Sequence, residues 1–219
     1  MNFDFTEVKK DIKALKARSG DLTELKPLGI GGDEADVYEY ASVAVKSFKS
    51  HKPSVMKEIK NNIKLSRVGI KRGINFAPYI DFEKKGQEVF AYMPKVDGVR
   101  LTDDNALEKL VAIGPEGLKK FFDDYIAVNE IGFLTDVNVN NYLVSDKGIN
   151  MVDLGINNGR PIDKKFNCRD AKAILDYWQN KIALNPVFGP EGDKKKMLVK
   201  ELARNTESVL SSLPEYVGN

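Results

Sequence analysis

The sequence contains very few of the residues that build disulfides, zinc sites and histidine-dependent catalysis. Its 219 residues include one cysteine, Cys168, and one histidine, His51. A single cysteine excludes an intrachain disulfide and a multi-cysteine zinc site, and it is typical of a protein that works in a reducing compartment. A single histidine excludes zinc motifs that need two histidines. We therefore expect any catalysis to depend on carboxylates, lysines or hydroxyls.

Long apolar runs and a large net charge are also lacking. No segment approaches the length of a membrane span, and residues 1–10 lack the apolar core of a signal peptide. The formal net charge is only +2, which gives no general argument for nucleic acid or a membrane as a partner. We expect neither partner and a cytosolic site of action, while secretion by a signal of another kind stays open.

The first part of the chain alternates helical and strand patterns. Apolar residues at helical spacing predict an amphipathic helix over residues 5–17, and short β-type runs follow between residues 25 and 50. A second helix is expected to begin at Pro53 and to stop at Gly69. Two more strands are expected at residues 77–82 and 88–93.

From about residue 95 the pattern becomes mostly helical, apart from one hairpin. The composition, 42% hydrophobic and 30% charged, is that of a globular protein with enough mass for a core. The sequence therefore predicts an α+β fold. We expect a helical extension over residues 1–22, a small β-rich lobe over 23–94 and a mostly α lobe over 95–219.

The hairpin lies in the stretch TDVNVNNYLVSDKGINMVDLG, residues 135–155. Its turn, SDKG, ends on a glycine, which suits a backbone conformation that other residues resist. If Val144 faces Ile149, antiparallel pairing brings Asn141 close to Asp153 at the open end of the hairpin.

Asp136 lies just upstream and supplies a third oxygen-bearing side chain, so this end of the hairpin could hold Mg²⁺. Two other interpretations fit some of these residues. Asn and Asp are common in turns because they bond their own backbone, so each residue alone suits a structural role. Asp136, Asn138 and Asn140 also match the start of a calcium-binding loop, but that pattern fails at Asn141 and Lys147, where it requires glycine and glutamate.

Three upstream features fit a phosphate ligand. The glycines of PLGIGG, residues 27–32, let backbone amides approach phosphate oxygens. Lys46 ends the apolar run VAVK, where an ammonium needs an anionic partner unless it faces solvent. Glu58, on the helix that follows, is the only glutamate in residues 47–82 and could pair with Lys46 to direct that cation at nucleotide phosphates.

The order of these parts resembles the protein-kinase superfamily over about residues 25–180. The resemblance implies a bilobal kinase-like fold that uses ATP and Mg²⁺ to phosphorylate serine or threonine in a protein. It implies that Asp136 is the catalytic base, that Lys46 contacts the phosphates and pairs with Glu58, and that Asn141 and Asp153 hold the magnesium. It also implies a nucleotide site made of Gly29, Gly31, Gly32, Val37, Lys46, Met93, Pro94, Lys95 and Val96.

The sequence departs from the kinase pattern in several places. The third glycine of the loop is missing, and Glu34 lies near its place. Leu134 and Thr135 replace the usual His-Arg, Asn138 replaces a catalytic-loop lysine, and only a short segment precedes Asp170. Asp170 is expected at the start of a helix as its N-cap. The resemblance to kinases implies that it also anchors the catalytic loop, and the two roles are compatible.

A kinase-like chain of this length, with a leading helix and so short a segment after Asp153, resembles the minimal kinases that some bacteria inject into host cells as type III effectors. That resemblance implies a protein substrate in the host cell, with a heat-shock chaperone as one specific case, and we expect a monomer. Two alternatives stay open. The chain could phosphorylate a small molecule, or it could be a catalytically silent nucleotide-binding module that acts by contact with a partner.

Overall fold

The computed structural model describes residues 3–18, 25–29, 35–50, 52–157, 159 and 161–214. The chain divides into two compact units, Met1–Val96 (unit 1) and Asp97–Asn219 (unit 2), and each is described by itself. Both units mix helices with antiparallel strands, so the predicted α+β class is confirmed.

Unit 1 is built on a five-stranded antiparallel sheet with the strand order β1-β2-β3-β5-β4. The strands are β1 Lys26–Gly29, β2 Ala35–Tyr40, β3 Val43–Phe48, β4 Asp81–Lys85 and β5 Glu88–Pro94. The strands predicted between residues 25 and 50 are present. β2 and β3 are joined by a tight turn in which Ala41 has a φ of 47°.

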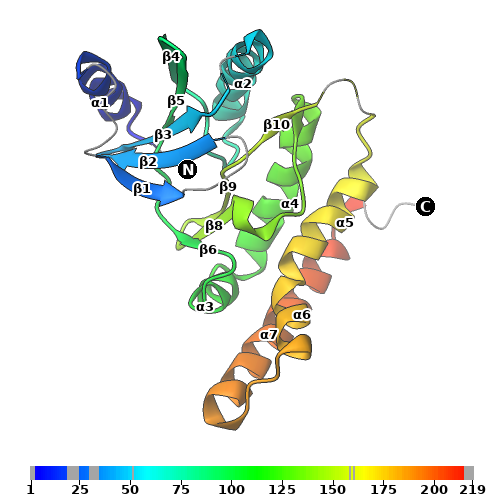
Figure 1. The fold of residues 1–219 in the computed structure, drawn as a ribbon. Helices are drawn as coiled ribbons and strands as arrows, with labels where there is room; N and C mark the ends of the chain where they lie inside the picture. Colours follow the sequence, from blue (N-terminus) through cyan, green and yellow to red (C-terminus); the bar gives the residue numbers. More distant parts are fainter. Residues whose placement is uncertain are drawn as a thin grey trace. The chain divides into compact units, whose positions relative to one another are not determined.

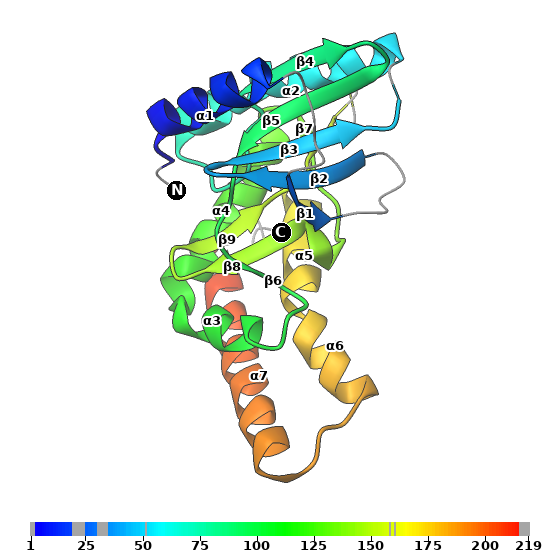
Figure 2. The same ribbon diagram turned by 60° about the vertical axis from the view of Figure 1, so that its left-hand side comes forward.

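Two helices cover opposite faces of this sheet (Figures 1 and 2). Along β3 the side chains alternate, so Val43 and Val45 face α1, Phe5–Ala17, while Ala44 faces α2, Pro53–Arg72. The apolar stripe that predicted α1 packs in the first of these clusters, and Ile59 of α2 packs in the second. Because β3 and β5 are central strands, both of their faces are buried.

The predicted end of α2 is wrong by one turn. Gly69 is buried within the helix, where a glycine costs only about 1 kcal/mol relative to alanine. The helix ends instead at Arg72, and its C-cap, Gly73, has a φ of 68° and donates its N–H to the carbonyls of Gly69 and Ile70. Left-handed backbone of this kind favours glycine and closes the last helical turn.

The strand predicted over residues 77–82 begins later than expected, at Asp81. Before it, the Tyr79 N–H donates to the Ser66 hydroxyl of α2 at 3.0 Å instead of to a neighbouring strand. This buried side chain replaces the ladder partner, so the segment stays irregular.

Unit 2 is mostly helical and contains two small antiparallel sheets. The helices are α3 Ala106–Ala112, α4 Gly114–Glu130, α5 Lys164–Leu175, α6 Tyr177–Leu184 and α7 Gly189–Leu210. The sheets are β6-β8-β9 (Val99–Arg100, Tyr142–Ser145 and Gly148–Met151) and β10-β7 (Gly155–Ile156 and Phe133–Leu134). A short 3₁₀ helix, Val139–Asn141, leads into β8.

The core of unit 2 forms around α4, whose buried face carries Leu118, Phe121, Phe122 and Tyr125. α4 contacts α5, α7 and β9. Trp178 of α6 is 1% exposed and belongs to this core, and its indole N–H donates to the Leu101 carbonyl at 3.0 Å. None of the described helices is both long and apolar enough to cross a bilayer.

Candidate functional site

In unit 1, several of the predicted nucleotide-binding residues lie in one row across the sheet. Gly29 of β1 is paired with Val37 of β2, Val37 with Lys46 of β3, and Lys46 with Ala91 of β5. Paired residues of neighbouring strands share a face, so Val37 and Lys46 lie on the face covered by α2. The register therefore brings these residues together although 17 positions separate Gly29 from Lys46 in the sequence.

Lys46 is buried, with 9% of its surface exposed. Its ammonium lies 5.5 Å from the centre of the Phe48 ring. The alternative of a solvent-facing strand lysine is therefore wrong. A buried ammonium is costly unless anions or π-systems stabilise it, which suits a lysine that contacts an anionic ligand.

Met93 and the three residues after it extend this region along β5. Met93 is 5% exposed, pairs with Ala44 and lies on the same face as Lys46, whereas Pro94 is the last residue of β5.

The Lys95 N–H donates to the Ser42 carbonyl at 2.8 Å. The Lys95 ammonium lies 2.9 Å from Glu39, and hydrogen bonds from Lys26 and Lys95 lower the pKa of that carboxyl group.

Gly31 and Gly32, which were predicted to belong to the nucleotide site, lie outside the described residues. Val96 is half-buried at the end of unit 1. The expected ion pair between Lys46 and Glu58 is not formed within the described part of the chain. Glu58 immediately precedes the buried Ile59 but is itself exposed, because the helix directs neighbouring side chains about 100° apart.

In unit 2, the hairpin has the predicted register. Val144 pairs with Ile149, Tyr142 with Met151, and the Val152 N–H donates to the Asn141 carbonyl at 2.9 Å. Backbone pairing thus continues to the residue before Asp153. The chain segments that carry Asn141 and Asp153 lie side by side at the open end of the hairpin, as the sequence predicted.

Asp136 contacts Asn141 directly. The Asn141 amide nitrogen lies 3.2 and 3.3 Å from the two carboxylate oxygens of Asp136. The Asn138 N–H donates to Asp136 Oδ1 at 2.8 Å, and Asn138 Oδ1 in turn accepts from the Asn140 N–H at 3.1 Å. Asp136 is exposed, so its orientation is set by these hydrogen bonds and not by burial.

Buried polar groups beneath the loop hold it in place. The Asn129 amide of α4 donates to the Thr135 hydroxyl at 2.9 Å and to the Tyr125 carbonyl at 2.8 Å. The Tyr142 hydroxyl donates to the Asp136 carbonyl. Burial, then the neighbouring Tyr125 hydroxyl and the carboxylates of Asp136 and Asp170, raises the pKa of Tyr142, which keeps its hydroxyl protonated as a donor.

The Tyr125 hydroxyl is buried close to Thr135 and Tyr142 but makes no hydrogen bond of good geometry. Burial raises the pKa of Tyr125 to about 12. Asn129, Tyr125 and Tyr142 were not singled out from the sequence. Their helical and strand positions are typical of ordinary core residues, so only the fold shows that they support the loop.

The prediction that Asp170 caps a helix is wrong. α5 begins at Lys164, and its N-cap is Asp163, whose carboxylate accepts from the Phe166 N–H at 3.1 Å. Asp170 lies within the helix, close enough to Tyr125 and Tyr142 to raise the pKa of both hydroxyls. Partial burial raises the pKa of Asp170 itself.

The groups that could hold a metal are few. Among the described residues, no three His, Cys, Asp or Glu side chains gather to form a metal site. Asn141 and Asp153 instead offer one amide oxygen and one carboxylate. Mg²⁺ accepts such oxygen ligands and is typically bound by only one or two protein groups when a substrate phosphate and water complete its octahedron.

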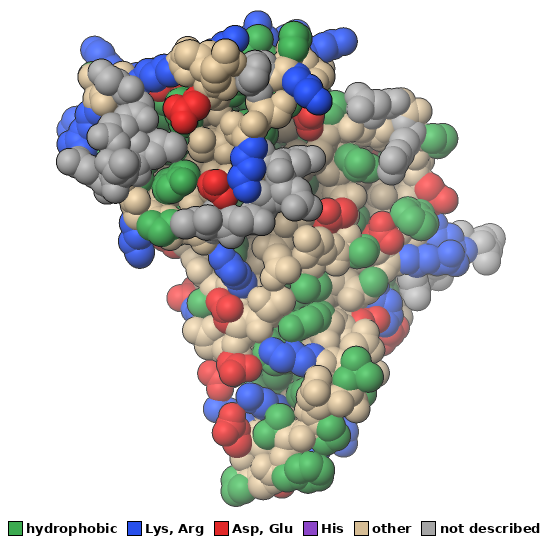
Figure 3. Space-filling model, in the orientation of Figure 1, with side chains coloured by type: hydrophobic (Ala, Val, Ile, Leu, Met, Phe, Trp, Pro, Cys, Tyr) green, Lys and Arg blue, Asp and Glu red, His purple; other side chains and the backbone are tan. Residues whose placement is uncertain are grey.

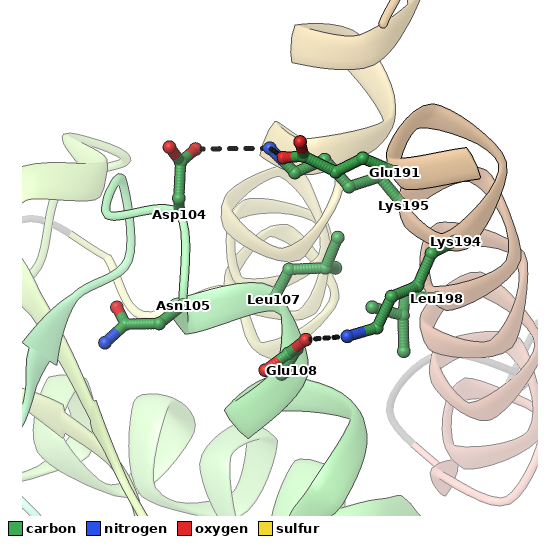
Figure 4. Close-up of a pocket in the computed structure, with 8 residues that line it drawn as sticks. All are labelled: Asp104, Asn105, Leu107, Glu108, Glu191, Lys194, Lys195 and Leu198. Atoms are coloured by element: carbon green, nitrogen blue, oxygen red, sulfur yellow. Dashed lines mark hydrogen bonds and ion pairs between the residues drawn. The ribbon is translucent and has the colours of Figure 1, made fainter. Parts of the chain in front are cut away.

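A surface pocket lies elsewhere in unit 2, between α3 and the start of α7 (Figure 4). Lys194 pairs with Glu108, while Lys195 pairs with Glu191 at 3.2 Å and with Asp104 at 3.7 Å. The two lysines of the lining are thus both paired, and its three carboxylates leave one net negative charge. None of the predicted catalytic or nucleotide-binding residues lines it.

The geometry thus has two parts, the row of residues around Lys46 in unit 1 and the Asp136–Asn141 pair beside Asp153 in unit 2. Similarity to known proteins adds no residue to this candidate site. No protein-family model matches the chain, and no curated protein matches it.

Proposed function

We propose that the chain is a phosphotransferase of the protein-kinase type, which transfers the γ-phosphoryl group of ATP to a serine or threonine of a protein. One observation carries the proposal: the Asp136 carboxylate is held by the Asn141 amide, at the end of a hairpin whose second strand leads directly to Asp153. A general base beside a pair of magnesium ligands is the constellation that phosphoryl transfer to a hydroxyl requires.

Each residue has a defined task in this proposal. Lys46 contacts the phosphates of ATP, and its burial favours an anionic partner. Asp136 orients the acceptor hydroxyl and takes its proton while a new P–O bond forms and the bond to the ADP oxygen breaks. Asn141 and Asp153 would hold Mg²⁺, which would supply positive charge to the phosphates.

The hydrogen bonds of Asp136 support its task. Asn138 and Asn141 donate to the carboxylate, so it is oriented before an acceptor binds. The Asp136 backbone is fixed separately by Tyr142. Pre-oriented groups avoid a reorganisation cost during the reaction.

The proposal includes the finer assignments that follow from the resemblance to kinases: a bilobal kinase-like fold, a minimal bacterial effector acting in the host cytosol, and a host protein such as a chaperone as substrate. The connection between β10 and α5 consists of residues 157–163, and its shortness supports a truncated activation segment. In contrast, the exposed position of Glu58 favours the silent binding module as the second candidate, because a kinase-type active site needs the Lys46–Glu58 pair.

Radiolabelled ATP and Mg²⁺ provide the test, with purified chain incubated with a protein panel and with small-molecule hydroxyl acceptors. We expect labelled protein with the wild type and at least about 100-fold less with Asp136→Asn. Asp123→Asn is the matched control, because Asp123 is a surface carboxylate paired with Lys119 on α4. Labelling of small molecules alone would show the wrong acceptor class, and nucleotide binding without turnover would show a silent module.

A further inference from the structure

α2 carries an unusual concentration of positive charge. The segment from Lys52 to Arg72 contains seven basic residues and a single acidic one, Glu58, although the whole chain has a net charge of only +2. In Figure 3, lysine and arginine side chains lie along the upper edge of the view, which includes the place of α2 in Figure 1 as well as those of α1 and β4. The charge is therefore a local property of this helix.

Five of these cations form a single row, which we call the cationic stripe. Its members follow one another at intervals of three and four residues, and all are exposed: Lys57, Lys60, Lys64, Arg67 and Lys71. This spacing places them on one helical face, over a length of about 21 Å at 1.5 Å per residue. The opposite face of α2, with Ile59, Asn62, Ser66 and Gly69, is buried.

The charges of the stripe are not neutralised within the described residues. None of the five takes part in an ion pair there, although Lys60 lies 5.7 Å from the centre of the Phe82 ring. Like charges at i,i+3 and i,i+4 destabilise a helix by about 0.2–0.5 kcal/mol per pair. The stripe lowers helix stability in the isolated chain, and an anionic partner would relieve this repulsion.

We propose that the cationic stripe of α2 binds an acidic helix of a partner protein. Glutamates spaced every three and four residues on a second helix repeat at the same interval as the stripe, so several ion pairs can form in register. Val68, 41% exposed at the edge of the stripe, supplies an apolar contact for such a helix.

The stripe fits other polyanions less well. Apart from Val68 it exposes no large apolar side chain, whereas a helix that binds a membrane interface inserts a broad apolar face. None of its members is aromatic, and the Phe82 ring beside Lys60 is half-buried, so the stripe offers no exposed ring on which the bases of a single strand could stack. This surface is independent of the proposed phosphoryl transfer and stands even if the chain has no kinase activity.

The test is fluorescence anisotropy with two labelled peptides of about 20 residues, both Ala/Gln-based with five glutamates. One peptide places the glutamates at three- and four-residue intervals, and the other has the same composition with the glutamates spread around the helix. We expect the full-length chain to bind the patterned peptide at least about tenfold more tightly, because exposed ion pairs are individually weak and only several in register add up. Binding should also fall as salt is raised.

Lys57→Glu/Lys64→Glu/Lys71→Glu removes alternate members of the stripe and creates Glu–Lys and Glu–Arg pairs that favour helix α2. Loss of the patterned peptide's binding by this variant supports the proposal, provided that its circular dichroism is unchanged. The matched control, Lys9→Glu/Lys10→Glu/Lys13→Glu, makes the same charge change on the exposed face of α1 and should leave binding within about twofold of wild type.

If the charge reversal leads to unfolding, the neutral variant Lys57→Gln/Lys64→Gln/Lys71→Gln replaces it and should still weaken binding by about tenfold. Equal binding of both peptides, or an equal loss with the α1 control, would overturn the proposal in favour of a diffuse charge effect. Tighter binding to duplex RNA, duplex DNA or phosphatidylserine vesicles than to the patterned peptide would overturn the choice of partner.

Discussion

The sheet of unit 1 and the loop of residues 135–141 in unit 2 position their candidate groups by different physical means. Lys46 is fixed by strand register and is buried. Asp136 is exposed and is oriented by hydrogen bonds from Asn138 and Asn141. A change at Lys46 is therefore expected to alter packing and charge together, whereas a change at the surface of the loop is expected to alter chemistry with little effect on stability.

The largest effect is expected at Asp153. Asp153→Ala removes the carboxylate proposed to hold Mg²⁺, and a metal contributes several kcal/mol to phosphoryl transfer, so we expect turnover to fall by about a thousandfold or more. Because Asp153 is exposed, the thermal unfolding midpoint should change little. ATP turnover and Mg²⁺-dependent nucleotide binding are the measurements. Wild-type turnover by this variant would remove the metal role of Asp153.

The second effect concerns the framework beneath the loop. Phe121 is 1% exposed, and its ring centre lies 5.9 Å from that of Tyr125 and 5.8 Å from that of Tyr142. Phe121→Ala should lower the free energy of unfolding by about 3–5 kcal/mol because it leaves a cavity there. Phe166→Ala is the control, since Phe166 is 57% exposed, and it should change stability by less than about 0.5 kcal/mol in urea titrations. Similar losses in the two variants would contradict this account of the core.

Lys46→Met separates charge from packing in unit 1. Methionine retains most of the buried aliphatic chain, so the packing around position 46 is largely kept while the positive charge is removed. Turnover should fall by about 100-fold, because a fixed positive charge on the phosphates is lost. Turnover and the unfolding midpoint are measured together. A strong loss of stability with normal turnover would show that Lys46 is structural.

Several features could be predicted from the sequence because they depend on neighbouring residues. The helix over residues 5–17 follows from apolar spacing, and the hairpin register follows from the turn SDKG and the alternation beside it. The proximity of Asn141 to Asp153 was a consequence of that register. In each case the deciding interactions lie within about twenty residues of one another.

Other features depended on contacts that the sequence does not display. Whether Glu58 pairs with Lys46 depends on the rotation of α2 over the sheet, and the helix leaves Glu58 exposed. Asp170 resembled an N-cap, but Asp163 occupies that position one turn before Asn167. Asn129 could not be identified as an anchor of the loop, because its bond to Thr135 requires the chain to turn back on α4.

The two tyrosines beneath the loop offer a smaller and sharper test. Tyr142→Phe removes the donor to the Asp136 carbonyl and should lower the free energy of unfolding by about 0.5–1.5 kcal/mol. Tyr125→Phe removes a buried hydroxyl that makes no hydrogen bond within the described residues, so the free energy of unfolding should be unchanged or higher. Urea unfolding of the two variants gives the comparison directly. Equal losses of unfolding free energy in the two variants would mean that the Tyr125 hydroxyl makes a hydrogen bond in solution.

The smallest effect is the pH dependence expected from Asp170. Partial burial raises the pKa of its carboxyl group in the folded chain above the ordinary value of 3.8, so the protonated form is favoured there. The stability gained from this proton is fully present below pH 3.8 and is lost as the pH rises through the folded pKa. Asp170→Asn cannot ionise, so it should be more stable than the wild type at pH 7 and close to it at pH 3. Thermal unfolding of both proteins at the two pH values measures the difference. A variant that is less stable than the wild type at pH 7 would show instead that the Asp170 carboxylate makes a favourable contact. Such a contact is what an anchor of the loop of residues 135–141 requires.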